Sequence, residues 1–346
     1  MKNYKAVDLF CGIGGLSYGL KQAGIEVVAG IDIDESCRYA YEINNAPFIH
    51  KSVSDVSTQE LNELYNGSDI KILVGCAPCQ TFSKYTLKVA NREESQKWRL
   101  LDDFARKIQE IRPEIISMEN VPQLRKYDVF NDFITVLDRS GYYVSYDIVY
   151  CPDYGIPQKR SRLVLLASLL GPIVLIPKTH SKERYKTVRK VIECLGAIGE
   201  GGIDGNDSLH RCSGLTPINL ERIKQSVPGG KWCDWDRELL LNCHKKRTGK
   251  TYSSVYGRME WDKPSPTITT QFYAFGTGRF GHPEQDRALS LREGALLQTF
   301  PKKYKFFPKE KRIFINQIGR HIGNAVPVRL GEVIGRSIIA HIKEHR

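Results

Sequence analysis

The stretch Asp-Leu-Phe-Cys-Gly-Ile-Gly-Gly, residues 8 to 15, links the end of a predicted strand to a helix predicted to begin near Leu16. Its three glycines allow the backbone to turn sharply and to approach a ligand closely, with the free N–H groups of the helix behind them. A loop of this kind, placed after the first strand of a chain, is typical of folds that bind a nucleoside-containing cofactor.

Two nearby residues bear on which cofactor this loop holds. A dinucleotide-binding loop has Gly or Ala three residues after Gly14, where this chain has Ser17, so that pattern is imperfect. Asp32 ends the second predicted strand, at the position where a carboxylate accepts hydrogen bonds from ribose hydroxyls. From the residues alone, NAD and S-adenosylmethionine both fit.

The first half of the chain alternates short apolar runs with amphipathic stretches, which predicts a parallel, doubly wound α/β sheet. Ligands bind such sheets at the carboxyl ends of the strands. The predicted strands are Lys5 to Phe10, Glu26 to Ile31, Lys71 to Gly75, Glu114 to Glu119, Tyr143 to Tyr150 and Arg162 to Ala167.

The pattern changes after about residue 172, where Pro and Gly interrupt a loop-rich region with weak periodicity. We therefore predict a catalytic, cofactor-binding domain over residues 1–172 and a smaller region over 173–263. Residues 264–346 are expected to end that region and to return to the first domain, with a helix over Arg329 to Ile342.

Composition restricts the class of protein and its compartment. The 346 residues include no apolar run long enough to span a membrane and no signal peptide, so we expect a cytoplasmic protein without a membrane partner. Nine scattered cysteines indicate reduced thiols. Lys and Arg exceed Asp and Glu by 51 to 39, with basic clusters over 178–190 and 302–312 that suit either a polyanion or a solvated face.

The segment Gly-Cys-Ala-Pro-Cys-Gln, residues 75 to 80, contains the C-x-x-C of the chain. We interpret Cys76 as a small apolar core residue inside the strand. Cys79 falls at the end of the strand, in the expected ligand crevice, with Pro78 fixing the backbone before it. The spacing of the later Cys and His residues does not match a zinc site, so no metal is expected.

Two other strand ends supply polar partners for this thiol. Glu119 follows an apolar run and precedes Asn-Val-Pro; from its position alone it is either a reacting acid or the cap of the next helix. Arg160 and Arg162 stand just before the last predicted strand, where they either face solvent or hold an anion.

The order of these motifs resembles the DNA (cytosine-5) methyltransferases. Residues 8–15 resemble the family's cofactor motif, 78–80 its nucleophile motif, 119–121 its proton-donor motif and 158–162 its arginine motif. Residues 292–301 and 322–327 resemble its last two blocks, so the resemblance covers 4–168 and 264–342. The chain departs from the family at Cys76 and Ala77, where glycine and then proline or phenylalanine are usual, and at Thr81.

The resemblance implies a Rossmann-like class I methyltransferase fold with a smaller target-recognition domain. It also implies S-adenosylmethionine as the cofactor and transfer of its methyl group to carbon 5 of cytosine. Cys79 would add to C6, Glu119 would protonate N3, and Arg162 with Arg160 would steady the base and its phosphate. The implied cofactor residues are Phe10, Gly12, Gly14, Asp32, Ile33, Asp55 and Asn324.

The implied substrate is double-stranded DNA, from which the target cytosine is flipped into the pocket. Residues 81–98 resemble the family's loop over the flipped base, and 173–263 its target-recognition region. We expect a monomer, with any cognate restriction endonuclease acting separately. A transfer-RNA cytosine-5 methyltransferase of the same architecture, a non-catalytic DNA-binding relative and an NAD-dependent oxidoreductase are the alternatives.

Overall fold

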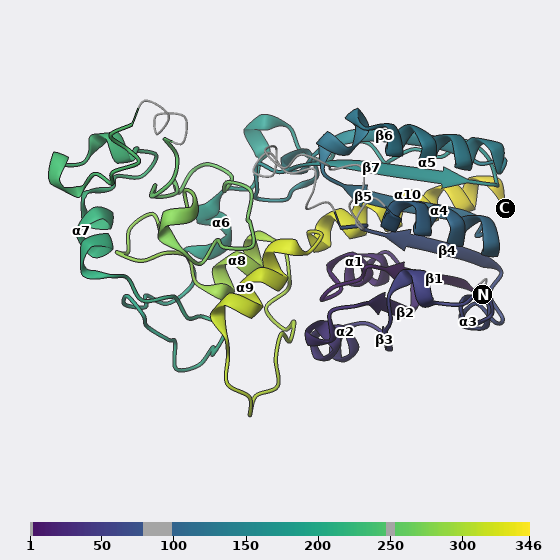
Figure 1. The fold of residues 1–346 in the computed structure, drawn as a ribbon, viewed down its shortest axis with the longest axis horizontal. Coiled ribbons are helices and arrows are strands. Elements are labelled where there is room, and N and C mark those ends of the chain that lie inside the picture. The colour runs from purple at the N-terminus through teal and green to yellow at the C-terminus, as the bar shows by residue number, and fades with distance from the viewer. Residues whose placement is uncertain (1–2, 79–98, 247–252) are drawn as a thin grey trace.

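The computed structural model describes residues 3–78, 99–246 and 253–346, and a seven-stranded sheet lies at one end of it (Figure 1). The strand order across the sheet is β3-β2-β1-β4-β5-β7-β6. The strands are β1 (Tyr4–Leu9), β2 (Glu26–Asp32), β3 (Phe48–His50), β4 (Ile70–Gly75), β5 (Ile115–Asn120), β6 (Tyr143–Tyr150) and β7 (Ser161–Ser168).

The six predicted strands are present, with ends that differ by at most one residue, and the short β3 was not predicted. The sheet is doubly wound as predicted, but the predicted parallel direction is wrong for β7, which runs antiparallel to both of its neighbours, β5 and β6. The connection from β6 to β7 explains this direction. Residues 151–160 form a short link without a crossover helix, and such a link joins antiparallel strands.

Helices cover both faces of the sheet. Leu16 and Leu20 of α1 and Ile338 of α10 pack in the core on one face, whereas Phe104 of α4 and Phe133 of α5 pack on the other. The helices are α1 (Gly15–Gln22), α2 (Arg38–Asn44), α3 (Thr58–Leu64), α4 (Arg99–Ile111), α5 (Asp128–Arg139), α6 (Val188–Ile192), α7 (Pro217–Gln225), α8 (Leu291–Leu297), α9 (Ile315–Asn324) and α10 (Val328–His345).

The chain leaves the sheet after β7, builds a second lobe with α6 to α9, and returns to the sheet as α10 (Figure 1). The helix α10 includes the predicted C-terminal helix over Arg329 to Ile342. The backbones of α10 and α1 pack closely at Gly19. A Cβ at this position would overlap the backbone nitrogen of Glu332, so only glycine permits this approach. Close packing of this kind fixes the C-terminal segment beside the glycine loop.

Two further properties concern the helices and the cysteines of the described residues. None of the helices in this part of the chain has the length and apolar character that a membrane span requires. None of the eight cysteines in the described parts of the chain forms a disulfide, as the sequence predicted.

Candidate active site

A cavity of about 310 Å³ opens at the carboxyl ends of β1, β2 and β4. Its volume falls at the lower end of the range for small-molecule sites. Five of the predicted cofactor residues form part of its wall, namely Phe10, Gly12, Asp32, Ile33 and Asn324. The structure therefore brings together residues that lie up to about three hundred positions apart in the sequence.

The glycine loop forms one side of this cavity. Phe10 and Gly12 have φ angles of 60° and 51°, so the loop turns through the left-handed region. A Cβ on Gly12 would meet no atom within 4 Å, which keeps the cavity wall open at that point. Gly14 has a different reason to be glycine and does not line the cavity: its Cβ would overlap the side-chain amide of Asn45, at the end of α2.

Asp32 stands at the end of β2 with its carboxylate oriented by the backbone. Its Oδ2 accepts a hydrogen bond from the Gly12 N–H at 2.7 Å, and its Oδ1 accepts one from the Asp34 N–H at 2.9 Å. Each oxygen keeps a further lone pair for a ligand hydroxyl. The next residue, Ile33, is 71% exposed although it is a large apolar side chain, and it lines the same cavity.

Asp55, another of the predicted cofactor residues, does not line the cavity. It ends the short helix η2 (Val53–Asp55) and is exposed. Ser52 and Val53, from the same turn, line the cavity, but Asp55 does not. The turn that carries Asp55 therefore reaches the cavity through neighbouring side chains.

A buried network behind the glycine loop explains the departure at Ser17. The Ser17 hydroxyl donates to Asp8 Oδ2 at 2.5 Å and lies 2.8 Å from the Tyr41 hydroxyl. Asp8 Oδ1 has no hydrogen-bond partner among the described residues, and Asp8 lines the cavity. Burial raises the pKa of Asp8 to about 7. Glycine or alanine at position 17 would remove this side-chain donor from Asp8 Oδ2.

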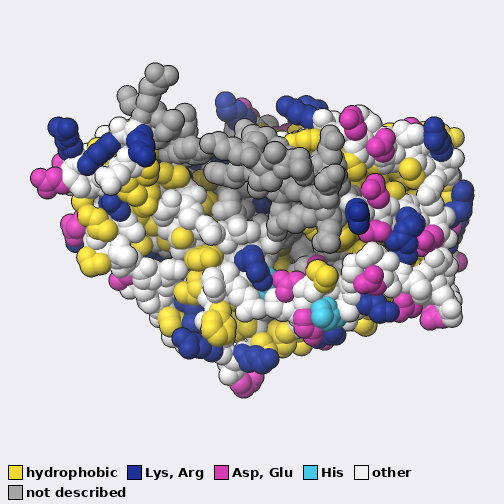
Figure 2. All heavy atoms as spheres, viewed as in Figure 1, with side chains coloured by type: hydrophobic (Ala, Val, Ile, Leu, Met, Phe, Trp, Pro, Cys, Tyr) yellow, Lys and Arg dark blue, Asp and Glu magenta, His cyan; other side chains and the backbone are white. Residues whose placement is uncertain are grey.

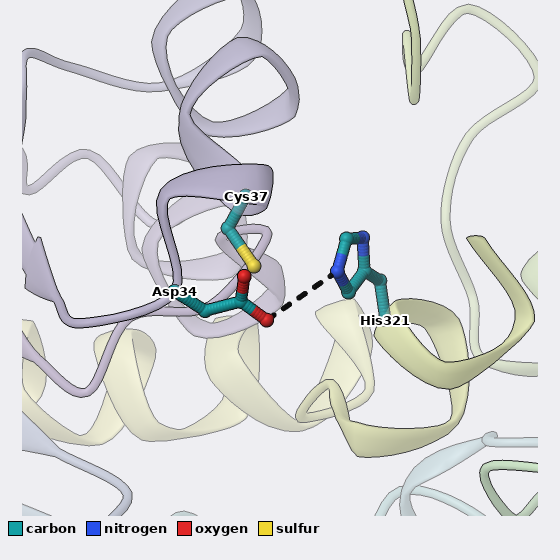
Figure 3. Close-up of side chains that lie close together, drawn as sticks. All are labelled: Asp34, Cys37 and His321. Atoms are coloured by element: carbon teal, nitrogen blue, oxygen red, sulfur yellow. Dashed lines mark ion pairs between the residues drawn. The ribbon is translucent and has the colours of Figure 1, made fainter. Parts of the chain in front are cut away.

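The first turn after β2 and helix α9 meet at the cluster of Asp34, Cys37 and His321 (Figure 3). A carboxylate oxygen, a thiol sulfur and a ring nitrogen lie within 4.8 Å of one another there, a set of ligand types that zinc accepts. The hydrogen bonds argue for a different role. Ser36 Oγ donates its single hydrogen to Asp34. His321 Nε2 lies 3.0 Å from Ser36 Oγ, so in this hydrogen bond the histidine nitrogen must carry the hydrogen and Ser36 Oγ must accept it.

The His321 nitrogen is therefore used as a donor and has no lone pair for a metal. Burial together with the nearby Asp32 and Asp34 raises the pKa of the Cys37 thiol, which opposes the thiolate form that a metal needs. Arg320 adds a cation 3.3 Å from Asp34 Oδ2. The cluster thus joins α9 to the β2 end, and this contact places Asn324 at the cavity.

Cys76 is not in the position that the sequence suggested. Strand β4 ends at Gly75, and Cys76 is a partly buried residue that lines the cavity rather than an apolar residue inside the strand. Its sulfur lies 2.9 Å from Glu119 Oε2. Asn120 fixes the same segment by donating to the Ala77 carbonyl at 3.1 Å. Cys79 lies outside the described residues, as do the expected loop residues 81–98.

Glu119 lies at the end of β5, where its side chain is almost completely buried, with 2% exposure. Its Oε1 is 2.9 Å from Arg162 Nε, close enough for an ion pair, but the N–H does not point at the oxygen well enough for a hydrogen bond. We interpret the contact as electrostatic, so that Oε1 keeps an acceptor position that none of the described residues uses. The structure therefore brings together the predicted acid and one of the predicted arginines.

Arg160 lies deeper than Arg162 and makes contacts inside the protein. It is 3% exposed, and its Nη1 donates to the Ile268 carbonyl at 3.2 Å. Burial, together with the like charge of Arg162, lowers the pKa of Arg160 to about 10. Among the described residues, the hydrogen bond of Arg160 joins the loop before β7 to the segment around Ile268.

Two buried amides, which the sequence analysis assigned no role, join three of the sequence motifs. Gln158 Nε2 donates to Gln298 Oε1 at 2.9 Å. Gln298 Nε2 donates in turn to the carbonyls of Ile322 and Ala325, at 2.8 and 3.1 Å. Both glutamines are fully buried. In the sequence, the feature that could have indicated this role is the glutamine within each of the motifs 158–162 and 292–301.

Comparison with known proteins assigns this arrangement to a family. The model of the family described as C-5 cytosine-specific DNA methylase matches residues 4–340. This chain belongs to that family. It is a cytosine-5 DNA methyltransferase, and the order of its motifs is that of the family.

Individual relatives agree with the assignment. The chain is 58% identical over 336 residues to the Type II methylase M.HgiDII of Herpetosiphon aurantiacus, covering 96% of this chain and 94% of the relative. It is 30% identical to the Type II methyltransferase M.Eco47II of Escherichia coli, over 97% of this chain and 79% of the relative.

A solved DNA modification methyltransferase encoded within an E. coli prophage matches with a TM-score of 0.74 at 20% identity, covering 99% of this chain and 100% of that one. Its low identity makes it evidence for the fold alone.

Proposed function

We propose that this enzyme transfers the methyl group of S-adenosylmethionine to carbon 5 of a cytosine flipped out of a specific short DNA sequence. In this proposal the Cys79 sulfur forms a transient bond to C6. The observation that carries the proposal is the buried carboxyl of Glu119, paired with Arg162 and in contact with the segment that leads into Cys79.

The chemistry assigned to these residues balances in protons and electrons. The Cys79 thiolate bonds to C6, the Glu119 carboxyl gives its proton to N3, and C5 becomes an enamine carbon that takes the methyl group. Loss of the C5 proton to solvent lets the C6–S bond break. The thiolate then leaves with its electron pair, and the N3 proton returns to Glu119.

The cavity beside these residues fits S-adenosylmethionine. Asp32 would hold the ribose hydroxyls with the lone pairs that Gly12 and Asp34 leave unused, and Ile33 would cover the adenine with its exposed apolar side chain. Asn324 would close the pocket from the returning segment, while Phe10 and Gly12 would form its floor. When bound, the cofactor supplies a methyl group on a positively charged sulfur, which needs no metal to be electrophilic.

Target recognition is proposed for residues 173–263, in the second lobe. The residues proposed for the chemistry lie outside this span, which leaves its basic and aromatic side chains for contacts to DNA. Relatives named Type II methylases and methyltransferases suggest a modification enzyme of a restriction system. We propose that it acts as a monomer, with any cognate endonuclease working separately.

The test uses a target duplex that carries 5-fluorocytosine. Fluorine cannot leave C5 as the proton does, so methylation should trap protein and DNA in a covalent adduct that survives denaturing electrophoresis. The Cys79→Ser variant should form no adduct and should still bind cofactor and DNA. A persistent adduct in that variant would refute the assignment of Cys79, and no adduct with the wild-type protein would refute the proposed covalent route.

A further inference from the structure

Cys76 connects the cofactor cavity to the catalytic acid. Its side chain is part of the cavity wall, and its sulfur lies 2.9 Å from Glu119 Oε2. A glycine at this position would have no side chain with which to reach the carboxyl. The contact therefore depends on the thiol of Cys76.

The two oxygens of Glu119 have different surroundings. Oε2 accepts the thiol hydrogen of Cys76, whereas Oε1 lies near Arg162 and receives no hydrogen bond of acceptable geometry from the described residues. A carboxylic acid that donates a proton needs one oxygen to carry the hydrogen and the other to act as the carbonyl oxygen. The Cys76 contact assigns the carbonyl role to Oε2 and leaves Oε1 for the base.

We propose that Cys76 is a positioning residue for Glu119, whose thiol holds Oε2 and thereby directs Oε1 toward N3 of the target cytosine. This inference rests on the proposed function. The thiol proton stays on Cys76 throughout, and the proton that moves belongs to Glu119.

The choice of sulfur has a physical consequence. A thiol is a weak hydrogen-bond donor, so it orients the carboxyl without strongly favouring the ionised form. A serine hydroxyl at the same place would donate more strongly and would favour the carboxylate, which cannot give a proton. Thiol and hydroxyl at position 76 should therefore differ in how the reaction depends on pH.

Among the described residues, the other titratable and charged groups near Glu119 should not obscure that difference. Cys79, the proposed nucleophile, is the same in both proteins, so its ionisation should affect both pH profiles alike. Arg162 and Arg160 come from the start of β7 and the loop before it, and Cys151 follows β6. Burial raises the pKa of Cys151 to about 11, and burial lowers that of Arg160 to about 10. Neither group changes its charge below about pH 9.

The experiment measures the single-turnover rate of adduct formation on the 5-fluorocytosine duplex at several pH values. The Cys76→Ala variant should react about two- to fivefold more slowly, the factor expected when one weak hydrogen bond is removed, with unchanged affinity for DNA. The Cys76→Ser variant should recover the rate at low pH and should lose it at a lower pH than the wild-type protein. Circular dichroism of both variants checks that they are folded.

A double-mutant cycle separates positioning from packing. Adding Cys76→Ala to the Glu119→Gln variant should cost much less than the same change costs in the wild-type background, because the carboxyl that Cys76 orients is then absent. Equal costs in the two backgrounds would mean that Cys76 only fills space and would overturn the inference. So would a Cys76→Ala variant with the wild-type rate and pH profile. A wild-type protein that forms no adduct would refute the proposed function instead.

Discussion

Replacing Asp8 by Asn should change how the stability of the protein depends on pH. Asp8 is 1% exposed, and burial raises its pKa to about 7 from the usual value of 3.8. Because the folded state binds this proton more tightly than the unfolded state, the carboxyl destabilises the fold as it ionises. The destabilisation begins above about pH 4, grows as the pH rises, and is complete above about pH 7.

The size of the effect follows from the pKa difference. One pKa unit corresponds to about 1.4 kcal/mol, so the full shift is worth on the order of 4 kcal/mol. The asparagine side chain in the variant cannot ionise, although its amide hydrogens would face the position where Asp8 Oδ1 has no partner among the described residues. That second effect adds a constant cost, so the pH dependence isolates the ionisation of Asp8.

The assay is urea unfolding of both proteins between about pH 5 and pH 8. The free energy of unfolding of the Asp8→Asn variant minus that of the wild-type protein should become more positive by up to about 1.4 kcal/mol per pH unit and then level off. Two parallel curves would show that Asp8 does not titrate in this range. The reasoning from its burial and its single donor, Ser17, would then be wrong.

Three further predictions concern packing, the cofactor and DNA. Gly19→Ala should lower the free energy of unfolding by about 1–3 kcal/mol, because its Cβ would meet α10 backbone, whereas Gly205→Ala, in open space, should be nearly neutral in the same urea titration. Asp32→Asn should weaken cofactor binding by about tenfold or more in calorimetry, because its amide would face one of two backbone N–H donors; unchanged affinity would count against the ribose assignment. Replacing Lys309 and Lys311 by Gln should reduce the slope of log affinity for DNA against log salt by about 0.9 for each phosphate that the variant no longer neutralises; an unchanged slope would mean that they face solvent.

The basic cluster over 302–312 is more available for contacts to DNA than the cluster over 178–190. Its six Lys and Arg residues are all exposed, and none of them forms an ion pair with another described residue. In the other basic cluster, Lys178 pairs with Asp153 and Arg189 with Glu193 and Asp262. On the face drawn in Figure 2, Lys and Arg side chains are spread over several places and do not form one continuous patch.

Most of the strands were predictable because buried strands are continuous apolar runs, and their ends are set by the first polar or turn-forming residue. The exception is β6, which lies at the edge of the sheet and is mostly exposed or half-buried. Strand direction was not predictable, because it depends on how the chain is connected. The residues of β7 read like those of any buried strand, and its reversal follows from the link over 151–160. The three residues of β3 were too few to give a pattern.

The site was predictable wherever a motif fixed the backbone. Asp32 ends β2 and Glu119 lies one residue before the end of β5, so the expected edge of the sheet was also the observed one. Asp55 and Cys76 were harder to place because each depends on where a side chain points after the regular element has ended. Cys76 directly follows the last residue of β4, so the strand does not fix the direction of its side chain, which lines the cavity.

The buried amides explain why widely separated motifs form one site. Gln158 is on the loop before β7, Gln298 follows α8, and the carbonyls of Ile322 and Ala325 flank the predicted pocket residue Asn324. A buried amide without its partners costs about 1–3 kcal/mol, so each glutamine stabilises the fold only when the returning segment is in place. The second lobe is inserted between β7 and α10, and these hydrogen bonds make the position of Asn324 depend on the loop that also carries Arg160. The Asn324 side of the cofactor cavity and the arginine loop are therefore held by the same hydrogen bonds, although the whole second lobe separates them in the sequence.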